Sequence, residues 1–173
     1  METVVLVNDR DEAIGTMEKM EAHQKGVLHR AFSVLLYQNG KILLQQRSLN
    51  KYHSSGLWTN TCCSHPRPDE TLENAGNRRL KEEMGIDCAV TPHFHFIYKA
   101  QLDGGLVEHE LDYVLFGSYD GAIYPNPEEV MDYKWINWNE LVEDITEHPE
   151  RYTAWLQILV EDYKQNIEEI LFS

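Results

Sequence analysis

The stretch SHPRPDETLENAGNRRLKEEMGI, residues 64–86, predicts a single amphipathic helix with defined ends. Apolar residues recur at helical spacing on one face, at Leu72, Ala75, Leu80 and Met84. Glu70 and Glu73 stand at the start of this run, where a carboxylate favours the positive end of the helix dipole, and Gly85 follows its end. We therefore expect a helix over residues 71–84.

The polar face of this helix carries a high concentration of charge, at Arg78, Arg79, Glu82 and Glu83. Two salt bridges at i,i+4 spacing, Arg78–Glu82 and Arg79–Glu83, are an ordinary way to stabilise a solvated helix. Taken alone, the charges favour that structural role. Their context favours chemistry instead, because Glu70 lies upstream of Arg78 and Gly85-Ile86 ends the run.

With these neighbours, residues 64–86 resemble the Nudix box, Gly-x5-Glu-x7-Arg-Glu-U-x-Glu-Glu-x-Gly-U, in which U is apolar. The matching residues are Glu70, Arg78, Leu80, Glu82, Glu83, Gly85 and Ile86. Ser64 replaces the first glycine of the box, and Arg79 replaces the glutamate after the arginine. In hydrolases of that superfamily this helix presents carboxylates to Mg²⁺ on a diphosphate. The cation at position 79 therefore argues against diphosphate hydrolysis.

The rest of the chain predicts several short strands and two further helical segments. Asn39-Gly40 predicts a tight turn between strands, and so does Asp103-Gly104-Gly105. The expected strands are 4–7, 31–37, 41–47, 93–101, 108–119 and 133–137, and the expected helices are 139–145 and 153–171. Residues 48–69 form a long polar segment without periodicity, which is typical of a functional loop. This irregular alternation predicts an α+β, or mixed α/β, fold.

Histidines and glutamates outside the helix form a second candidate site. His23, His29 and His65, each taken alone, are ordinary surface or capping histidines. Glu108 and Glu110 are spaced i,i+2 on an expected strand, so both carboxylates project to one face. Such a pair indicates either an exposed edge strand or a bound cation, because like charges this close repel each other. Three imidazoles with two carboxylates suit a divalent ion such as Zn²⁺ or Mn²⁺.

Segments along almost the whole chain resemble type I isopentenyl-diphosphate isomerases, a family with the Nudix fold. These segments are EKMEAH (18–23), LHRAFSV (28–34), GLWTNTCCSHP (56–66), IYKAQL (97–102), VEHEL (107–111) and TAW (153–155). The resemblance implies one domain over residues 1–173, with a mixed sheet, flanking helices, and N- and C-terminal extensions. Ser64 and Arg79, which depart from the hydrolase pattern, are normal for this family.

By this resemblance, the chain would interconvert isopentenyl diphosphate and dimethylallyl diphosphate by adding a proton to the alkene and removing another. Cys63 and Glu110 would be the two acid/base groups, with Tyr98 relaying a proton to Glu110. Trp155 would cap the hydrocarbon pocket and face a carbocation, and Trp58 would line the same pocket. The diphosphate would be bound by Lys19, Arg47, Lys51 and Arg79. We expect Cys62, by contrast, to pack in the core.

Two metal ions follow from the same resemblance. Mg²⁺ would bind the substrate diphosphate together with Glu83. One Mn²⁺ or Zn²⁺ would be held by His23, His29, His65, Glu108 and Glu110. The alternatives are a Nudix-type diphosphohydrolase, which has no need of Cys63, and a non-enzymatic domain in which the His/Glu cluster only stabilises the fold.

The composition restricts the partners. The 173 residues carry 15 Lys and Arg against 29 Asp and Glu, a formal net charge of −14, which argues against nucleic acid or an anionic membrane as the partner. A small anionic substrate stays compatible with this charge. Cys62, Cys63 and Cys88 form no disulfide framework and favour a reducing compartment. No signal peptide or long apolar stretch is recognisable, so we expect a cytoplasmic protein.

Overall fold

A mixed sheet forms the centre of the molecule. The computed structural model describes residues 2–173, and within them nine strands join one sheet. The strands are β1 (Thr3–Val7), β2 (Ala13–Glu18), β3 (His29–Gln38), β4 (Lys41–Arg47), β5 (Trp58–Thr59), β6 (Cys62–Ser64), β7 (Thr91–Gln101), β8 (Val107–Ser118) and β9 (Val130–Asn137). The helices are α1 (Lys19–Lys25), α2 (Leu72–Met84), α3 (Trp138–Glu147), α4 (Ala154–Asp162) and α5 (Lys164–Leu171), with short 3-10 turns η1 (Asp103–Gly105) and η2 (Pro149–Arg151). β3 runs parallel to β8, whereas its pairings with β1, β4 and β6 are antiparallel.

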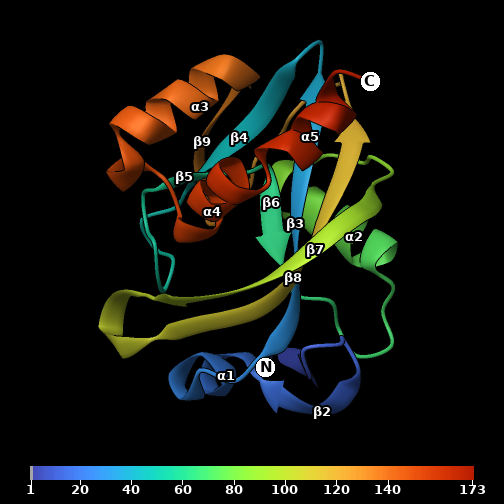
Figure 1. The fold of residues 1–173 in the computed structure, drawn as a ribbon, viewed down its shortest axis with the longest axis vertical. Helices are drawn as coiled ribbons and strands as arrows, with labels where there is room; N and C mark the ends of the chain where they lie inside the picture. Colours follow the sequence, from blue (N-terminus) through green and yellow to red (C-terminus); the bar gives the residue numbers. More distant parts are fainter. Residues whose placement is uncertain (1) are drawn as a thin grey trace.

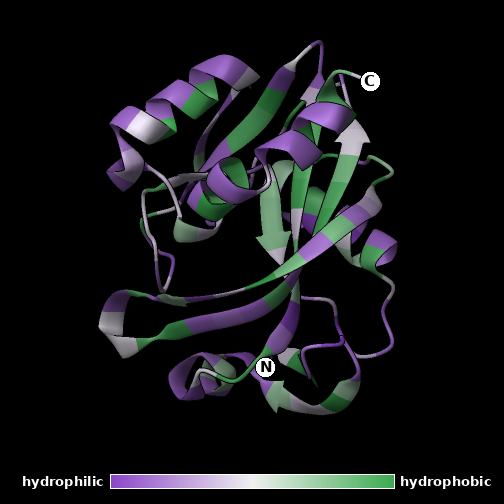
Figure 2. Ribbon diagram, viewed as in Figure 1, coloured by the Kyte–Doolittle hydropathy of each residue, from purple (hydrophilic) through white to green (hydrophobic). Residues whose placement is uncertain are grey.

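Helices cover both faces of the sheet, and a large hydrophobic core lies beneath the helices on each face. Figure 1 shows α3, α4 and α5 together on one side, with α2 behind the strands. Leu35 of β3 belongs to the core beneath α3–α5, whereas its neighbours Val34 and Leu36 belong to the core beneath α2. In Figure 2 the strands between the helices are largely green and the outer helix faces largely purple. This alternation is the period-2 pattern of a strand buried on both faces, and it confirms the predicted mixed fold.

The helix predicted over 71–84 is present as α2. Thr71 is its N-cap, and its hydroxyl accepts a hydrogen bond from the backbone N–H of Asn74. Gly85 ends the helix in the left-handed region at φ 63°. A Cβ at this position would lie 2.4 Å from the carbonyl oxygen of Tyr124, so only glycine fits. The caps therefore fix where α2 starts and stops relative to the sheet.

The hairpin predicted around Asn39-Gly40 forms, but its strands separate immediately. Both turn residues have positive φ, 48° for Asn39 and 74° for Gly40. β3 and β4 pair only at Tyr37–Ile42 and Gln38–Lys41. The other pairing partners of β3 include β6 and β8, and those of β4 are β5 and β9. Cys63 is thereby brought beside Ser33 on a central strand.

Two expectations about local structure are wrong. Residues 48–69 are not an unstructured loop, because they contain β5 and β6, which pair with β4 and β3. Residues 153–171 are not one helix, because Tyr163 has non-helical angles (φ −123°, ψ 21°) and separates α4 from α5. The Tyr163 ring stacks on Phe94 of β7 at 5.5 Å between centroids, so a tertiary contact accompanies the break.

The amino-terminal region contains elements that the sequence did not predict. β2 pairs with β1, and α1 follows it and carries the buried His23. The other predicted strands and the helix over 139–145 are present, with ends shifted by a few residues. No helix within residues 2–173 is long and apolar enough to cross a membrane.

Candidate active site

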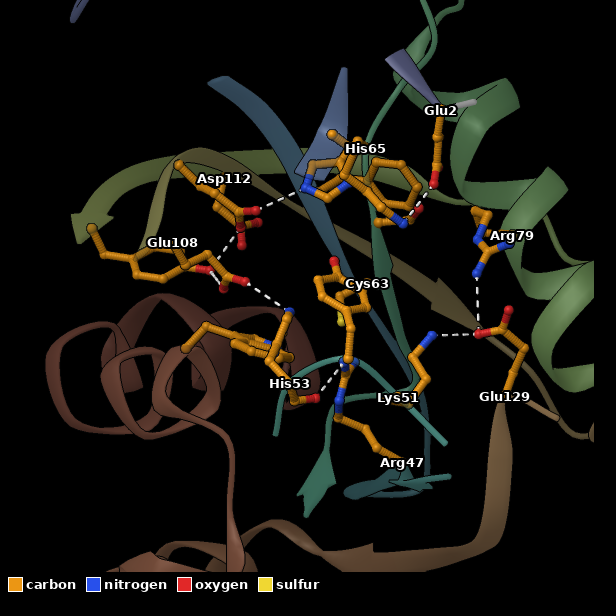
Figure 3. A pocket seen from close by; sticks show the side chains of 17 residues that line it. Glu2, Arg47, Lys51, His53, Cys63, His65, Arg79, Glu108, Asp112 and Glu129 are labelled. Carbon is orange, nitrogen blue, oxygen red and sulfur yellow. Dashed lines mark hydrogen bonds and ion pairs between the residues drawn. The ribbon is translucent and has the colours of Figure 1, made fainter. Parts of the chain in front are cut away.

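One pocket collects most of the residues that the sequence analysis singled out. Figure 3 shows Cys63 between Glu108 and His53 on one side and Lys51, Arg79 and Glu129 on the other. The predicted residues that line it are Lys19, Arg47, Lys51, Cys63, His65, Arg79, Tyr98, Glu108, Glu110 and Trp155. His23, His29 and Glu83 are buried behind this lining. Of the predicted residues, Trp58 lies apart, with the Lys134 ammonium 4.5 Å from its ring centroid.

One end of the pocket is a row of buried carboxyl groups on β8. Glu108, Glu110 and Asp112 share one face of the strand and are 4%, 5% and 1% exposed. Because β8 pairs with both β3 and β7, it is not an edge strand, and the exposed-edge interpretation of the glutamate pair is wrong. A buried row of carboxylates requires protons or a cation to offset its charge.

Tyr98 connects two of these carboxyl groups. It pairs with Glu110 across the β7–β8 ladder, and its hydroxyl donates to Glu110 Oε1 at 2.7 Å while also contacting Glu108 Oε1. Burial alone would raise the pKa of Glu110, but hydrogen bonds from the His29 and His65 rings hold it well below its usual range. Burial and the adjacent Glu110 charge raise the pKa of Glu108. The two carboxyl groups thus differ in proton affinity although they share a strand.

The rings of three histidines lie beside the row of carboxyl groups on β8. The rings of His23, His29 and His65 have centroids 5.0–5.8 Å apart. The Nδ1 of His23 lies 2.8 Å from the Lys19 carbonyl oxygen, and that of His29 lies 2.9 Å from the Val27 carbonyl oxygen. A carbonyl oxygen only accepts hydrogen bonds, so each Nδ1 donates to it, and the Nε2 of each ring is left facing the carboxyl groups.

This arrangement fits a divalent cation. His23 Nε2 is buried, lacks a hydrogen-bond partner among residues 2–173, and lies 3.7 Å from Glu108 Oε2. A lone pair facing a carboxylate oxygen is repulsive unless a proton or a metal ion lies between them. Donor atoms of two sets, His23–His29–His65–Glu110 and His23–His53–Glu108, each lie within 4.8 Å of one another. Imidazole and carboxylate donors are those that Zn²⁺ and Mn²⁺ accept.

Cys63 lies on β6, at the junction of this cluster with the rest of the pocket. Burial raises the pKa of its thiol, so the group is protonated at neutral pH and can act as an acid. Cys62 points to the opposite face of the strand and is fully buried in the α2 core. The packing role predicted for Cys62 is therefore confirmed.

The opposite end of the pocket is cationic, and acidic side chains already pair its cations. Lys51 Nζ lies 2.5 Å from Glu129 Oε2, and an Arg79 nitrogen lies 3.5 Å from the same oxygen. Lys19 Nζ contacts Glu2 at 2.8 Å. Burial opposes ionisation of Glu129, but the hydrogen bond from Lys51 and the nearby cations lower its pKa overall.

The two charged pairs predicted on α2 are present, but neither is the closest contact of its arginine. Arg79 approaches Glu82 at 2.6 Å and Glu83 at 3.5 Å. Arg78 instead holds Glu70 with two hydrogen bonds of 2.8 and 2.9 Å. Burial raises the pKa of Glu83, and one of its oxygens has no hydrogen-bond partner within the described residues. Arg79 and Glu83 thus occupy the inner surface of α2, beside the pocket.

The Trp155 indole closes the apolar side of the pocket. Its Nε1–H donates to Asn60 Oδ1 at 3.0 Å, which fixes the ring orientation. The Arg47 guanidinium carbon lies 5.4 Å from the ring centroid, within cation–π distance. The ring is thus held rigidly where a bound hydrocarbon would contact it.

Comparison with known proteins assigns the family. The NUDIX domain family profile matches residues 27–156. Isopentenyl-diphosphate Delta-isomerase 2 of Aromatoleum aromaticum is 48% identical over 154 residues, which cover 88% of this chain and 82% of that protein. Isopentenyl-diphosphate Delta-isomerase of Photobacterium profundum is 53% identical over 161 residues, or 89% of each chain. This chain belongs to the NUDIX-fold isopentenyl-diphosphate Delta-isomerase family.

Solved structures show the same fold in more distant proteins. A Deinococcus radiodurans protein superposes with a TM-score of 0.75 at 17% identity, covering 99% of this chain and all of that one. A MutT protein of Methanosarcina mazei Go1 gives a TM-score of 0.65 at 19% identity, covering 82% of this chain and 96% of that one. At these identities the likeness concerns the fold alone.

The sequence analysis missed five polar residues that line the pocket: Glu2, Tyr52, His53, Asp112 and Glu129. Asp112 continues the i,i+2 alternation of Glu108 and Glu110, so the strand pattern contained the signal that identifies it. His53 and Glu129 lie in segments without periodicity, where only the folded chain shows which way a side chain points.

Proposed function

We propose that this protein interconverts isopentenyl diphosphate and dimethylallyl diphosphate by adding a proton to the alkene at one carbon and removing a proton from another carbon. The observation that carries the proposal is a single pocket with two dissimilar ends. Acid/base candidates Cys63, Tyr98 and Glu110 line one end, and cations suited to a diphosphate line the other. The family membership supports the same activity.

The proposed chemistry needs an acid and a base that act at different carbons. One group gives a proton to the terminal alkene carbon, forming a C–H bond and a tertiary carbocation. The other group removes a proton from the carbon on the opposite side of the cation, and its C–H electrons form the new double bond. Net proton count is unchanged. Cys63 is the candidate acid, because its thiol is protonated. Glu110, which accepts a hydrogen bond from the Tyr98 hydroxyl, is the candidate base, because its carboxyl group is ionised.

Trp155 would stabilise the intermediate cation. An aromatic face is attracted to a desolvated cation by about 2 kcal/mol or more. The hydrogen bond to Asn60 keeps the indole from turning away. Trp58 was also expected to line the hydrocarbon pocket. It packs against the same core cluster as Trp155 and would support that ring rather than contact the hydrocarbon.

The diphosphate would bind Lys19, Arg47, Lys51 and Arg79. Three of these cations, Lys19, Lys51 and Arg79, are within 3.5 Å of Glu2 or Glu129. When substrate binds, these cations would therefore exchange their carboxylate partners for phosphate oxygens. Mg²⁺ would accompany the diphosphate and use the unpartnered Glu83 oxygen, since Mg²⁺ prefers oxygen ligands.

A second ion, Mn²⁺ or Zn²⁺, would be held by His23, His29, His65, Glu108 and Glu110. When bound, it would neutralise the carboxyl row and lower the proton affinity of Glu110. The acidic net charge supports a small-molecule partner rather than nucleic acid or an anionic membrane. The three free cysteines support a reducing, cytoplasmic location.

The deciding experiment is incubation with isopentenyl diphosphate in deuterated water, followed by NMR. We expect deuterium in the new methyl group of dimethylallyl diphosphate. The alternative, Nudix-type hydrolysis, predicts phosphate or pyrophosphate release with no label on carbon. A non-enzymatic metal-binding domain predicts neither product, and either of these two outcomes would refute the isomerase proposal.

A further inference from the structure

His53 lies inside the histidine/carboxyl cluster although its segment shows no motif. It is 4% exposed and lines the pocket. Its Nε2 is 3.4 Å from Glu108 Oε2, and its ring stacks near His23 with centroids 5.9 Å apart. Glu108 Oε2 is therefore approached by two imidazole nitrogens, from His53 and from His23.

The hydrogen bonding of His53 follows that of His23 and His29. In each ring Nδ1 is close to an oxygen on the outer side of the cluster: the Lys19 carbonyl for His23, the Val27 carbonyl for His29, and the Ser54 hydroxyl at 3.0 Å for His53. A metal-binding histidine usually donates its second ring N–H to such an acceptor, which orients the ring and frees the other nitrogen. His53 thus has the outer partner expected of a ligand.

Its backbone is also anchored. The Ser54 N–H donates to Asp103 Oδ2 at 3.0 Å, which ties the segment to the β7–β8 turn. An Arg47 nitrogen donates to the His53 carbonyl at 3.1 Å. These contacts hold the ring over Glu108 rather than leaving it on a loose loop.

The two donor sets cannot serve two ions at once. Both use His23, whose Nδ1 is engaged with Lys19 O, so only Nε2 is available. One ring nitrogen has one lone pair and binds one ion. The two sets therefore describe a single ion that His23 shares with donors on both sides.

From this geometry we propose that His53 is a further ligand of the metal ion, binding through Nε2 on the Glu108 side of the cluster. The inference rests on the metal site of the proposed isomerase and adds one donor to it. Four imidazoles and two carboxylates exceed the four ligands of a tetrahedral Zn²⁺ site and suit an ion of higher coordination number.

The test uses the full chain stripped of metal and titrated with Co²⁺, without substrate. We expect His53→Ala and His53→Gln to weaken Co²⁺ binding at least ~10-fold in chelator competition, the lower end of the cost of losing even an outer-shell partner. His93→Ala, at an exposed position of β7, is the matched control and should bind as the wild type. His65→Ala is the positive control for loss of binding.

A second readout separates ligation from mere positioning of Glu108. In proton NMR of the Co²⁺ protein, the N–H of a bound imidazole gives a strongly shifted, exchangeable resonance. We expect one such resonance to be absent in His53→Gln. Unchanged affinity, or weaker binding with every shifted resonance retained, would refute ligation by His53. Because no turnover is measured, such a failure leaves the isomerase proposal to the deuterium experiment.

Discussion

The two ends of the pocket are built differently. At the metal end, His29, Glu108 and Glu110 lie on paired strands, His23 lies on α1 and His65 directly follows β6, and each carboxyl group is almost completely buried. At the cation end, Lys19, Lys51 and Arg79 come from separate segments, remain partly exposed, and are each already paired with a glutamate. One end has excess negative charge in a rigid frame, and the other has balanced charge on longer side chains.

This difference indicates different tasks. A rigid frame suits proton transfer, because acid/base groups must hold their positions to within fractions of an ångström. Paired, partly exposed cations suit the capture and release of a diphosphate, since one set of anionic partners replaces another at modest net cost. Predictions about single residues can therefore separate losses in kcat from losses in KM.

The largest effect is expected at Cys63, where the two ends meet. Cys63→Ser keeps the size of the side chain but replaces a thiol with a hydroxyl of much higher proton affinity. We expect kcat to fall at least ~100-fold with little change in KM, the lower range for a positioned acid/base group. Steady-state kinetics measure this. Cys88→Ser, outside the pocket, should retain kcat, and a near-normal kcat for Cys63→Ser would contradict the acid/base role.

Reversing the charge of Arg79, at the cation end of the pocket, should weaken substrate binding rather than lower kcat. Arg79→Glu removes a cation beside Glu129 and adds an anion facing the diphosphate. We expect KM to rise ~10- to 100-fold, with no efficient hydrolase activity gained, because the substitution replaces a charge-assisted contact to the diphosphate with like-charge repulsion. Lys81→Glu, on the exposed face of α2, is the matched control. An unchanged KM would remove Arg79 from the diphosphate site.

A smaller effect, of opposite sign, is expected at Glu129. Glu129→Gln removes the carboxylate that holds Lys51 and Arg79 in the free protein. We expect inorganic pyrophosphate with Mg²⁺ to bind ~2- to 5-fold more tightly in calorimetry, since a partly exposed ion pair is worth about 1 kcal/mol or less. Glu128→Gln, at the exposed neighbouring position, should change nothing. Weaker binding by Glu129→Gln would show that the carboxylate orients the cations for substrate.

The metal end was largely predictable from sequence, and the cation end only in part. The i,i+2 spacing of Glu108 and Glu110 fixes a shared face whatever the rest of the chain does. The partners of Lys51 and Arg79 depend on how residues after β8 return to the sheet, and Glu129 in that segment follows no period. His53 was not predicted either, because its segment also lacks a periodic pattern. The apolar stripe of 153–171 continues through Tyr163, so spacing alone misses the break between α4 and α5.

The smallest effect concerns Glu70–Arg78, a pair that joins the segment before α2 to the helix and binds no substrate in this scheme. The two hydrogen bonds from Arg78 hold the pKa of Glu70 below its usual 4.5. A lowered folded-state pKa stabilises the protein above the unfolded value, and this contribution is lost as pH falls through the folded pKa. Glu70→Gln should therefore lower the Tm at pH 7 by an amount corresponding to about 1 kcal/mol or less, and the difference from wild type should vanish at acidic pH. Thermal unfolding from pH 7 to pH 3 measures this, with the exposed Glu73→Gln as control. A Tm difference that persists at low pH would mean that Glu70 stabilises α2 by packing and not by charge.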